Sequence, residues 1–98
     1  MDYERRALDA SLSAAVGDEP QLIADLRGAF FESASVHVAE LQAAKTPEDW
    51  RLAAQRLKGL AASFGALGLL DAVAGALEHG RRKSDLAQIE QAIASLKD

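Results

Sequence analysis

The chain is organised around residues 53–66, which read Ala53-Ala54-Gln55-Arg56-Leu57-Lys58-Gly59-Leu60-Ala61-Ala62-Ser63-Phe64-Gly65-Ala66. Apolar side chains recur in this segment at the three- and four-residue spacing that predicts an amphipathic helix. The apolar stripe consists of Trp50, Ala53, Ala54, Leu57, Leu60, Ala61 and Phe64. We expect the helix to end at Gly65, because glycine is favoured directly after a helix.

The opposite face of this predicted helix has an unusual composition. It carries Arg51, Leu52, Gln55, Lys58, Gly59 and Ala62. A glycine inside a helix costs about 1 kcal/mol relative to alanine, and Leu52 is a large apolar residue among polar and small ones. Two interpretations stay open. The face is a docking surface, or it holds a tolerated glycine beside an ordinary exposed leucine.

The composition restricts the class of protein. A length of 98 residues predicts a single domain over residues 1–98. The absence of cysteine excludes disulfides, thiolate catalysis and cysteine-based zinc sites, and we expect neither a metal nor a cofactor. No apolar run approaches the roughly 18–20 residues that cross a bilayer. The charged N-terminus leads into no signal-like segment, so we expect a cytoplasmic protein without membrane contact.

The charged residues argue against a nucleic-acid partner. The net charge is −4, from 15 acidic and 11 basic residues, whereas nucleic-acid binding requires a basic face. Basic residues do gather at Arg51, Arg56 and Lys58, and again over residues 81–83. A local basic patch on an acidic chain fits a small anionic site on a partner better than a long polyanion.

The same periodicity predicts helices over residues 2–16, 20–44, 47–64, 66–78 and 85–97. Gly17 should end the first helix, Thr46 should cap the third, and Ser84-Asp85 should cap the fifth, with a loop over residues 81–83. Short connections favour antiparallel neighbours. We therefore expect an all-α fold, an antiparallel up-down four-helix bundle with an additional N-terminal helix laid across one end.

Two histidines are candidates for functional residues. His37 falls in the predicted inward stripe of the second helix, where a core or boundary histidine is the ordinary interpretation. Glu40 follows it by three residues, but one carboxylate with one imidazole is weak support for a metal site. His79 is expected at a helix C-terminus, where a protonated imidazole is favoured.

The central helix resembles the signature of histidine-containing phosphotransfer (HPt) domains. Residues Gln55-Arg56-Leu57-Lys58-Gly59, with Gly65-Ala66 and Leu69 after them, match the pattern His-x-Leu-Lys-Gly followed by Gly-Ala-x-x-Leu. The similarity extends over nearly the whole chain, through the order and lengths of the helices. It implies a four-helix bundle whose members relay a phosphoryl group between receiver-domain aspartates through one exposed histidine.

The resemblance assigns roles to individual residues. Lys58 would offset the charge of the phosphoryl oxygens, and Gly59 would leave room for the receiver's active site. Leu52 and Ala62 would belong to the apolar contact zone, while Arg51 and Arg56 would steer an acidic receiver surface.

The chain departs from the family at the acceptor itself, where Gln55 stands in place of histidine. A carboxamide can donate and accept hydrogen bonds, but it lacks the nucleophilic nitrogen of an imidazole. The sequence therefore predicts a docking face without phosphotransfer chemistry, in a natural pseudo-HPt protein or in a His→Gln variant of a competent one. We expect a monomer that is not an enzyme, with a response-regulator receiver domain or a hybrid histidine kinase as its partner.

Two other hypotheses stay open. Phosphate could be carried by a histidine outside the motif, His37 or His79. Alternatively, the chain is a structural or self-associating helical bundle, in which the patch formed by Leu52, Gly59 and Ala62 is a homodimer contact. The start at Met1 and a last helix reaching almost to Asp98 suggest a free-standing protein.

Overall fold

A computed structural model describes residues 2–79 and 83–97 of the chain, and this part is all-helical, with no strand. The helices are α1 (Asp2–Val16), α2 (Pro20–Ala43), α3 (Pro47–Phe64), α4 (Leu67–His79) and α5 (Lys83–Ala94). The prediction of an all-α protein is confirmed. The described helices include none long and apolar enough to cross a membrane.

The predicted helix ends are largely correct, and their local chemistry is visible. The Thr46 side chain accepts a hydrogen bond from the backbone N–H of Asp49 at 3.1 Å, which satisfies one of the free donors at the start of α3. Gly17 and Gly65 have φ values of +84° and +69°, in the left-handed region that glycine adopts without steric cost. Both glycines therefore end the preceding helix as expected.

The predicted cap of the last helix is wrong. Helix α5 begins at Lys83, so Ser84 and Asp85 lie inside its first turn instead of ahead of it. Asp85 still suits this place, because a carboxylate near a helix N-terminus is favoured by the helix dipole. The sequence predicts Lys83 in a loop, whereas it is helical; Arg81 and Arg82 lie outside the described residues.

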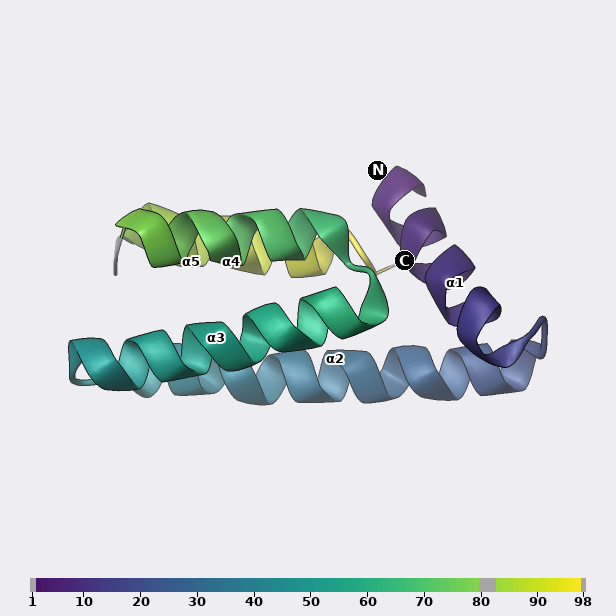
Figure 1. Ribbon diagram of the computed structural model, residues 1–98, viewed down its shortest axis with the longest axis horizontal. Helices are drawn as coiled ribbons and strands as arrows, with labels where there is room; N and C mark the ends of the chain where they lie inside the picture. The colour runs from purple at the N-terminus through teal and green to yellow at the C-terminus, as the bar shows by residue number, and fades with distance from the viewer. Residues whose placement is uncertain (1, 80–82, 98) are drawn as a thin grey trace.

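Helices α2 to α5 run along the long axis of a molecule that measures 42 × 21 × 18 Å, each antiparallel to the one before it (Figure 1). Helix α1 is inclined to the others at one end, where it packs against α2 and also reaches α3. The half-buried Asp9 carboxylate accepts hydrogen bonds from Nη2 and Nε of Arg27, at 2.7 and 3.1 Å. This ion pair ties α1 to α2.

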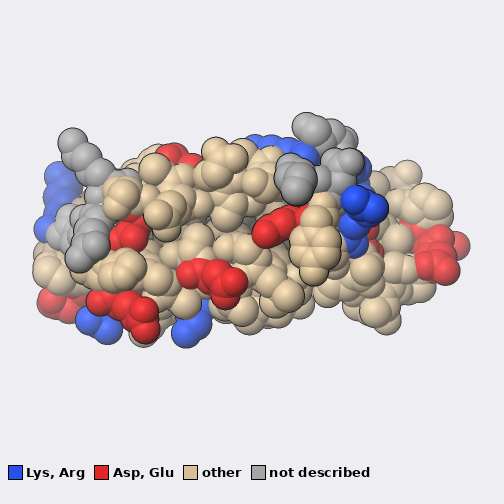
Figure 2. Space-filling model, turned by 90° about the horizontal axis from the view of Figure 1, so that it is seen from above, with Lys and Arg blue, Asp and Glu red and all other residues tan. Residues whose placement is uncertain are grey.

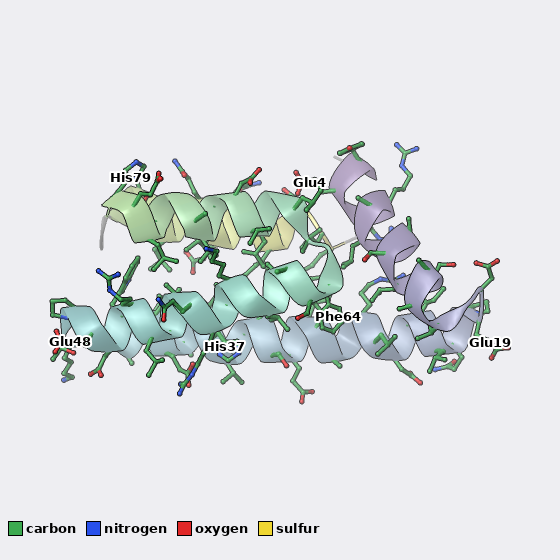
Figure 3. The ribbon with its side chains drawn as sticks, in the orientation of Figure 1. Glu4, Glu19, His37, Glu48, Phe64 and His79 are labelled. Carbon is green, nitrogen blue, oxygen red and sulfur yellow. The ribbon has the colours of Figure 1, made fainter. Side chains whose placement is uncertain are left out.

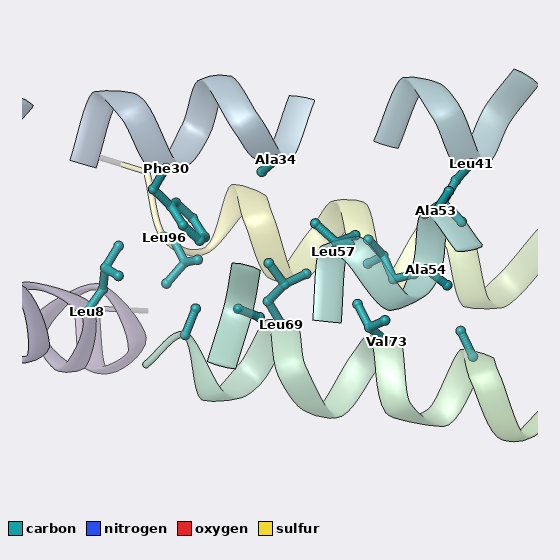
Figure 4. Close-up of a cluster of buried hydrophobic side chains, with 14 of the residues drawn as sticks. Leu8, Phe30, Ala34, Leu41, Ala53, Ala54, Leu57, Leu69, Val73 and Leu96 are labelled. Atoms are coloured by element: carbon teal, nitrogen blue, oxygen red, sulfur yellow. The ribbon is translucent and has the colours of Figure 1, made fainter. Parts of the chain in front are cut away.

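The core is a continuous set of apolar side chains between the helices (Figure 4). The largest fully buried side chains are Phe30, Leu8, Leu57, Leu69, Ile89, Leu96 and Val73. Helix α3 contributes mainly small residues, since Ala53, Ala54 and Ala61 are buried beside Leu57. Alanines allow α3 to pack closely between α2 and α4, and this fixes which face of α3 is left to solvent.

Candidate functional site: the exposed face of α3

The outer face of α3 is exposed along its length. Its residues Arg51, Leu52, Gln55, Arg56, Lys58, Gly59 and Ala62 are all solvent-exposed. Helical periodicity produces this arrangement, because the residues between them carry the buried stripe of the helix. The structure thus brings every residue of the HPt-like motif's outer side onto one surface.

Gly59 and Leu52 determine the shape of this surface: Gly59 has no side chain, and Leu52 projects into solvent. A Cβ atom built on Gly59 would meet nothing within 4 Å, so neither packing nor an unusual backbone conformation requires glycine there. Leu52 is 48 % exposed, one of a small group of large apolar residues left in solvent. Gly28 and Gly75 are equally open, however, so an unfilled glycine does not by itself identify a docking site.

Gln55 and Lys58 lie on this face without side-chain partners among the described residues. Neither side chain forms a hydrogen bond or an ion pair with any residue of the described ranges. Both groups are therefore available to an outside molecule. A free carboxamide beside a free ammonium group can bind oxygen atoms, but it offers no nucleophile for covalent chemistry.

Arg56 stands at the edge of the face and is held by α2. Its Nη1 lies 3.5 Å from Oε2 of Glu40, and the arginine side chain remains 51 % exposed. The other oxygen of Glu40, Oε1, lies 3.0 Å from Nδ1 of His37. The hydrogen bond from His37, with smaller charge effects from His37 and Arg56, lowers the pKa of Glu40 below its ordinary value, against the opposing effect of burial.

A shallow groove adjoins this edge of the face, between the end of α2 and the start of α3. Its volume is about 280 Å³, and it is lined by Glu40, Ala43, Ala44, Asp49, Leu52, Ala53 and Arg56. Leu52 is thus a wall of a concave surface as well as an exposed side chain. Sequence reasoning missed the groove, because the end of α2 contributes to it and only the packing of α2 on α3 brings the two segments together.

His37 lies at the boundary of the molecule, which agrees with the prediction of a core or boundary histidine on the inward stripe of α2. Its side chain is 22 % exposed, at the boundary of α2 with α3 (Figure 3). The spacing His37-x-x-Glu40 was readable in the sequence, and residues three apart are neighbours on a helix. The ordinary interpretation of a boundary histidine with one satisfied ring nitrogen agrees with this geometry.

His79 lies far along the chain from the motif, at the end of α4 (Figure 3). Its Nδ1 is 3.4 Å from Oδ1 of Asp85, a carboxylate that is only 3 % exposed. Within the described residues, no group of three or more histidine or acidic side chains is placed to hold a metal ion.

The charge on the neighbouring surface is dispersed. On the face over α4 and α5, acidic and basic side chains of the described residues lie in small separate groups among uncharged ones (Figure 2). The described residues of this face form no continuous basic track of the kind a nucleic-acid backbone requires.

Comparison with known proteins adds no family assignment. A scan against models of protein families found no match, and neither did comparisons with curated proteins and with solved structures. The similarity to HPt domains therefore rests on the motif in α3 and on the helices around it.

Proposed function

We propose that this chain is an HPt-like signalling module that docks a receiver domain of a two-component phosphorelay through the exposed face of α3. One observation carries the proposal: Gln55, Lys58 and Gly59, in the spacing of the HPt motif, share a solvent-exposed face. In the same proposal α2 to α5 form an up-down four-helix bundle, with α1 across one end. The partner is a response regulator or the receiver part of a hybrid histidine kinase, in the cytoplasm.

The chemistry of the face favours binding without transfer. Gln55 would occupy the place of the acceptor imidazole and exchange hydrogen bonds with the receiver's active site, but it cannot attack a phosphorus atom. The Lys58 ammonium would lie against the receiver's carboxylates or phosphoryl oxygens. The chain would then hold a receiver without taking its phosphoryl group onto residue 55, and it would compete with an active phosphotransfer protein for the same surface.

The shape and charge of the face suit a small, transient interface. The small residues Gly59 and Ala62 leave the centre of the face without large side chains. Leu52 supplies an apolar contact, and Arg51 and Arg56 place positive charge at the rim. Complementary charge mainly increases the rate of encounter and the specificity of association. Transient signalling contacts commonly bury less than about 1,200 Å².

A binding titration with two matched leucine variants tests this function. Leu52 and Leu22 are exposed to similar extents, 48 % and 41 %, but Leu22 lies on α2, away from the α3 face. Leu52→Asp should abolish binding to an isolated receiver domain, measured by fluorescence anisotropy, and Leu22→Asp should leave it unchanged. Equal losses in both variants, or no binding to any receiver at high micromolar concentration, would refute the docking face.

Self-association is the second candidate, favoured by the exposed Leu52 beside the groove between α2 and α3. In that case the mass measured by light scattering should rise with concentration, and Leu52→Asp should keep the chain monomeric. A constant monomer mass combined with receiver binding would leave docking as the function of the face.

A further inference from the structure

His37 and Glu40 form a histidine–carboxylate pair outside the α3 motif. Nδ1 of His37 lies 3.0 Å from Oε1 of Glu40, one helical turn further along α2. Figure 3 places the histidine where α2 runs beside α3, at the boundary of the molecule and not in its core. Glu40 therefore holds the His37 ring at a place where part of the side chain reaches solvent.

The pair determines which ring nitrogen is reactive. The Glu40 carboxylate is ionised at neutral pH and can only accept hydrogen bonds, so in the 3.0 Å contact its oxygen accepts and Nδ1 of His37 donates. In the neutral ring the lone pair then resides on Nε2. This atom has no hydrogen-bond partner among residues 2–79 and 83–97, and it is not one of the fully buried polar atoms left unpaired there, so part of its surface reaches solvent.

We propose that Nε2 of His37 is a phosphoacceptor that takes a phosphoryl group from an acyl phosphate. The Nε2 lone pair attacks phosphorus and forms the N–P bond. The bond from phosphorus to the acyl oxygen breaks, and its electron pair leaves with the carboxylate. The imidazole becomes cationic with its proton still on Nδ1, where Glu40 stabilises it, so no proton has to move.

The surroundings favour His37 over His79 for this role. The guanidinium of Arg56 lies 3.5 Å from the second oxygen of Glu40, so a positive charge stands beside the carboxylate that holds His37. His79 is 3.4 Å from its carboxylate, and the free oxygen of Asp85 is buried without a partner in the described part of the chain. Among residues 2–79 and 83–97, a histidine–carboxylate contact of 3.0 Å and an arginine beside the same carboxylate occur together only at His37.

Phosphorylation of His37 does not depend on receiver docking, since His37 lies outside the α3 face. The whole chain is incubated with acetyl phosphate at neutral pH, and acid-labile phosphate is mapped by peptide mass spectrometry under mild alkaline conditions. His37→Gln should lose the label, whereas the matched variant His79→Gln should keep it. Circular dichroism melts establish that both variants fold.

A second variant tests the positioning role of Glu40. Glu40→Gln should slow labelling, and the nitrogen NMR shifts of the His37 ring should move away from the pattern of a ring protonated on Nδ1. No label on wild-type protein, a label on His79, or labelling that survives His37→Gln would overturn the inference. None of these outcomes affects the receiver titration, so the two proposals fail separately.

Discussion

Gly59 is the residue whose stability effect and proposed role point in opposite directions. Because a Cβ at this position would meet nothing, Gly59→Ala should stabilise the protein by about 0.5–1 kcal/mol through helix propensity. The added methyl group should weaken receiver binding if a close approach to the backbone is required. Urea denaturation and a receiver titration measure the two effects.

Gly28 supplies the control for this substitution. It is exposed, lies inside α2, and has equally open space where a Cβ atom would stand. Gly28→Ala should give a similar gain in stability and leave receiver affinity unchanged. If both alanine variants bind as tightly as the wild type, Gly59 is merely tolerated and has no role in docking.

Glu40 should titrate with a pKa below the ordinary range for a glutamate, chiefly because of its hydrogen bond to His37. Because the pKa of Glu40 is lower in the folded state, its ionised carboxylate stabilises the folded protein, and this stabilisation is complete above the pKa of the unfolded chain. It is lost as pH falls through the folded-state pKa. Carboxyl NMR titration should show the Glu40 pKa rising towards its ordinary value in His37→Ala; an unchanged midpoint would show that the histidine does not cause the shift.

At the residue scale, the sequence predicted what depends on helical phase alone. The outward position of Gln55, Lys58 and Gly59 follows from the spacing of the buried alanines and Leu57. The Arg56–Glu40 contact could not be predicted, because it depends on how α2 packs against α3. The sequence placed His37 on the inward stripe of α2, and it does lie between the buried Ala34 and Leu41, at 22 % exposure.

At the scale of elements, the turn between α3 and α4 depends on one glycine. Gly65 has φ +69°, and a Cβ there would lie 2.5 Å from Oγ of Ser11 in α1. Gly65→Ala should therefore cost the left-handed strain of about 1–2 kcal/mol and in addition the cost of moving the Ser11 side chain. Gly17 has φ +84°, and a Cβ there would meet nothing within 4 Å. Gly17→Ala should therefore cost only the backbone strain, as a loss of stability measured by urea denaturation. Equal losses would show that the Ser11 side chain moves aside without cost and that only the backbone strain matters at Gly65.

The helix boundaries show where local signals are sufficient. Thr46, Gly17 and Gly65 act through their own backbone and nearest neighbours, and each prediction made from them is confirmed. Asp85 is expected in a cap from the sequence, but it lies within the first turn of α5, buried beside His79. A carboxylate favours the whole N-terminal end of a helix, so its presence does not distinguish the cap from the turn that follows.

At the scale of the whole molecule, the distribution of charge matters more than its sum. The chain carries a net charge of −4, but the α3 face presents Arg51, Arg56 and Lys58 around small and apolar residues. This arrangement is expected to attract an acidic protein surface and to lose that attraction at high ionic strength. The sequence predicted the patch on the outer face of one helix, and the structure shows its three basic residues exposed there.

The central claim is that the docking face is intact and only the acceptor is missing. The most direct measurement compares this chain with Gln55→His, each mixed with a phosphorylated receiver, with binding recorded and phosphate mapped to the peptide that holds residue 55. We expect both proteins to bind the receiver and only Gln55→His to acquire acid-labile phosphate at residue 55. If Gln55→His neither binds nor takes phosphate, the resemblance to HPt domains is limited to architecture, and the α3 face serves another partner.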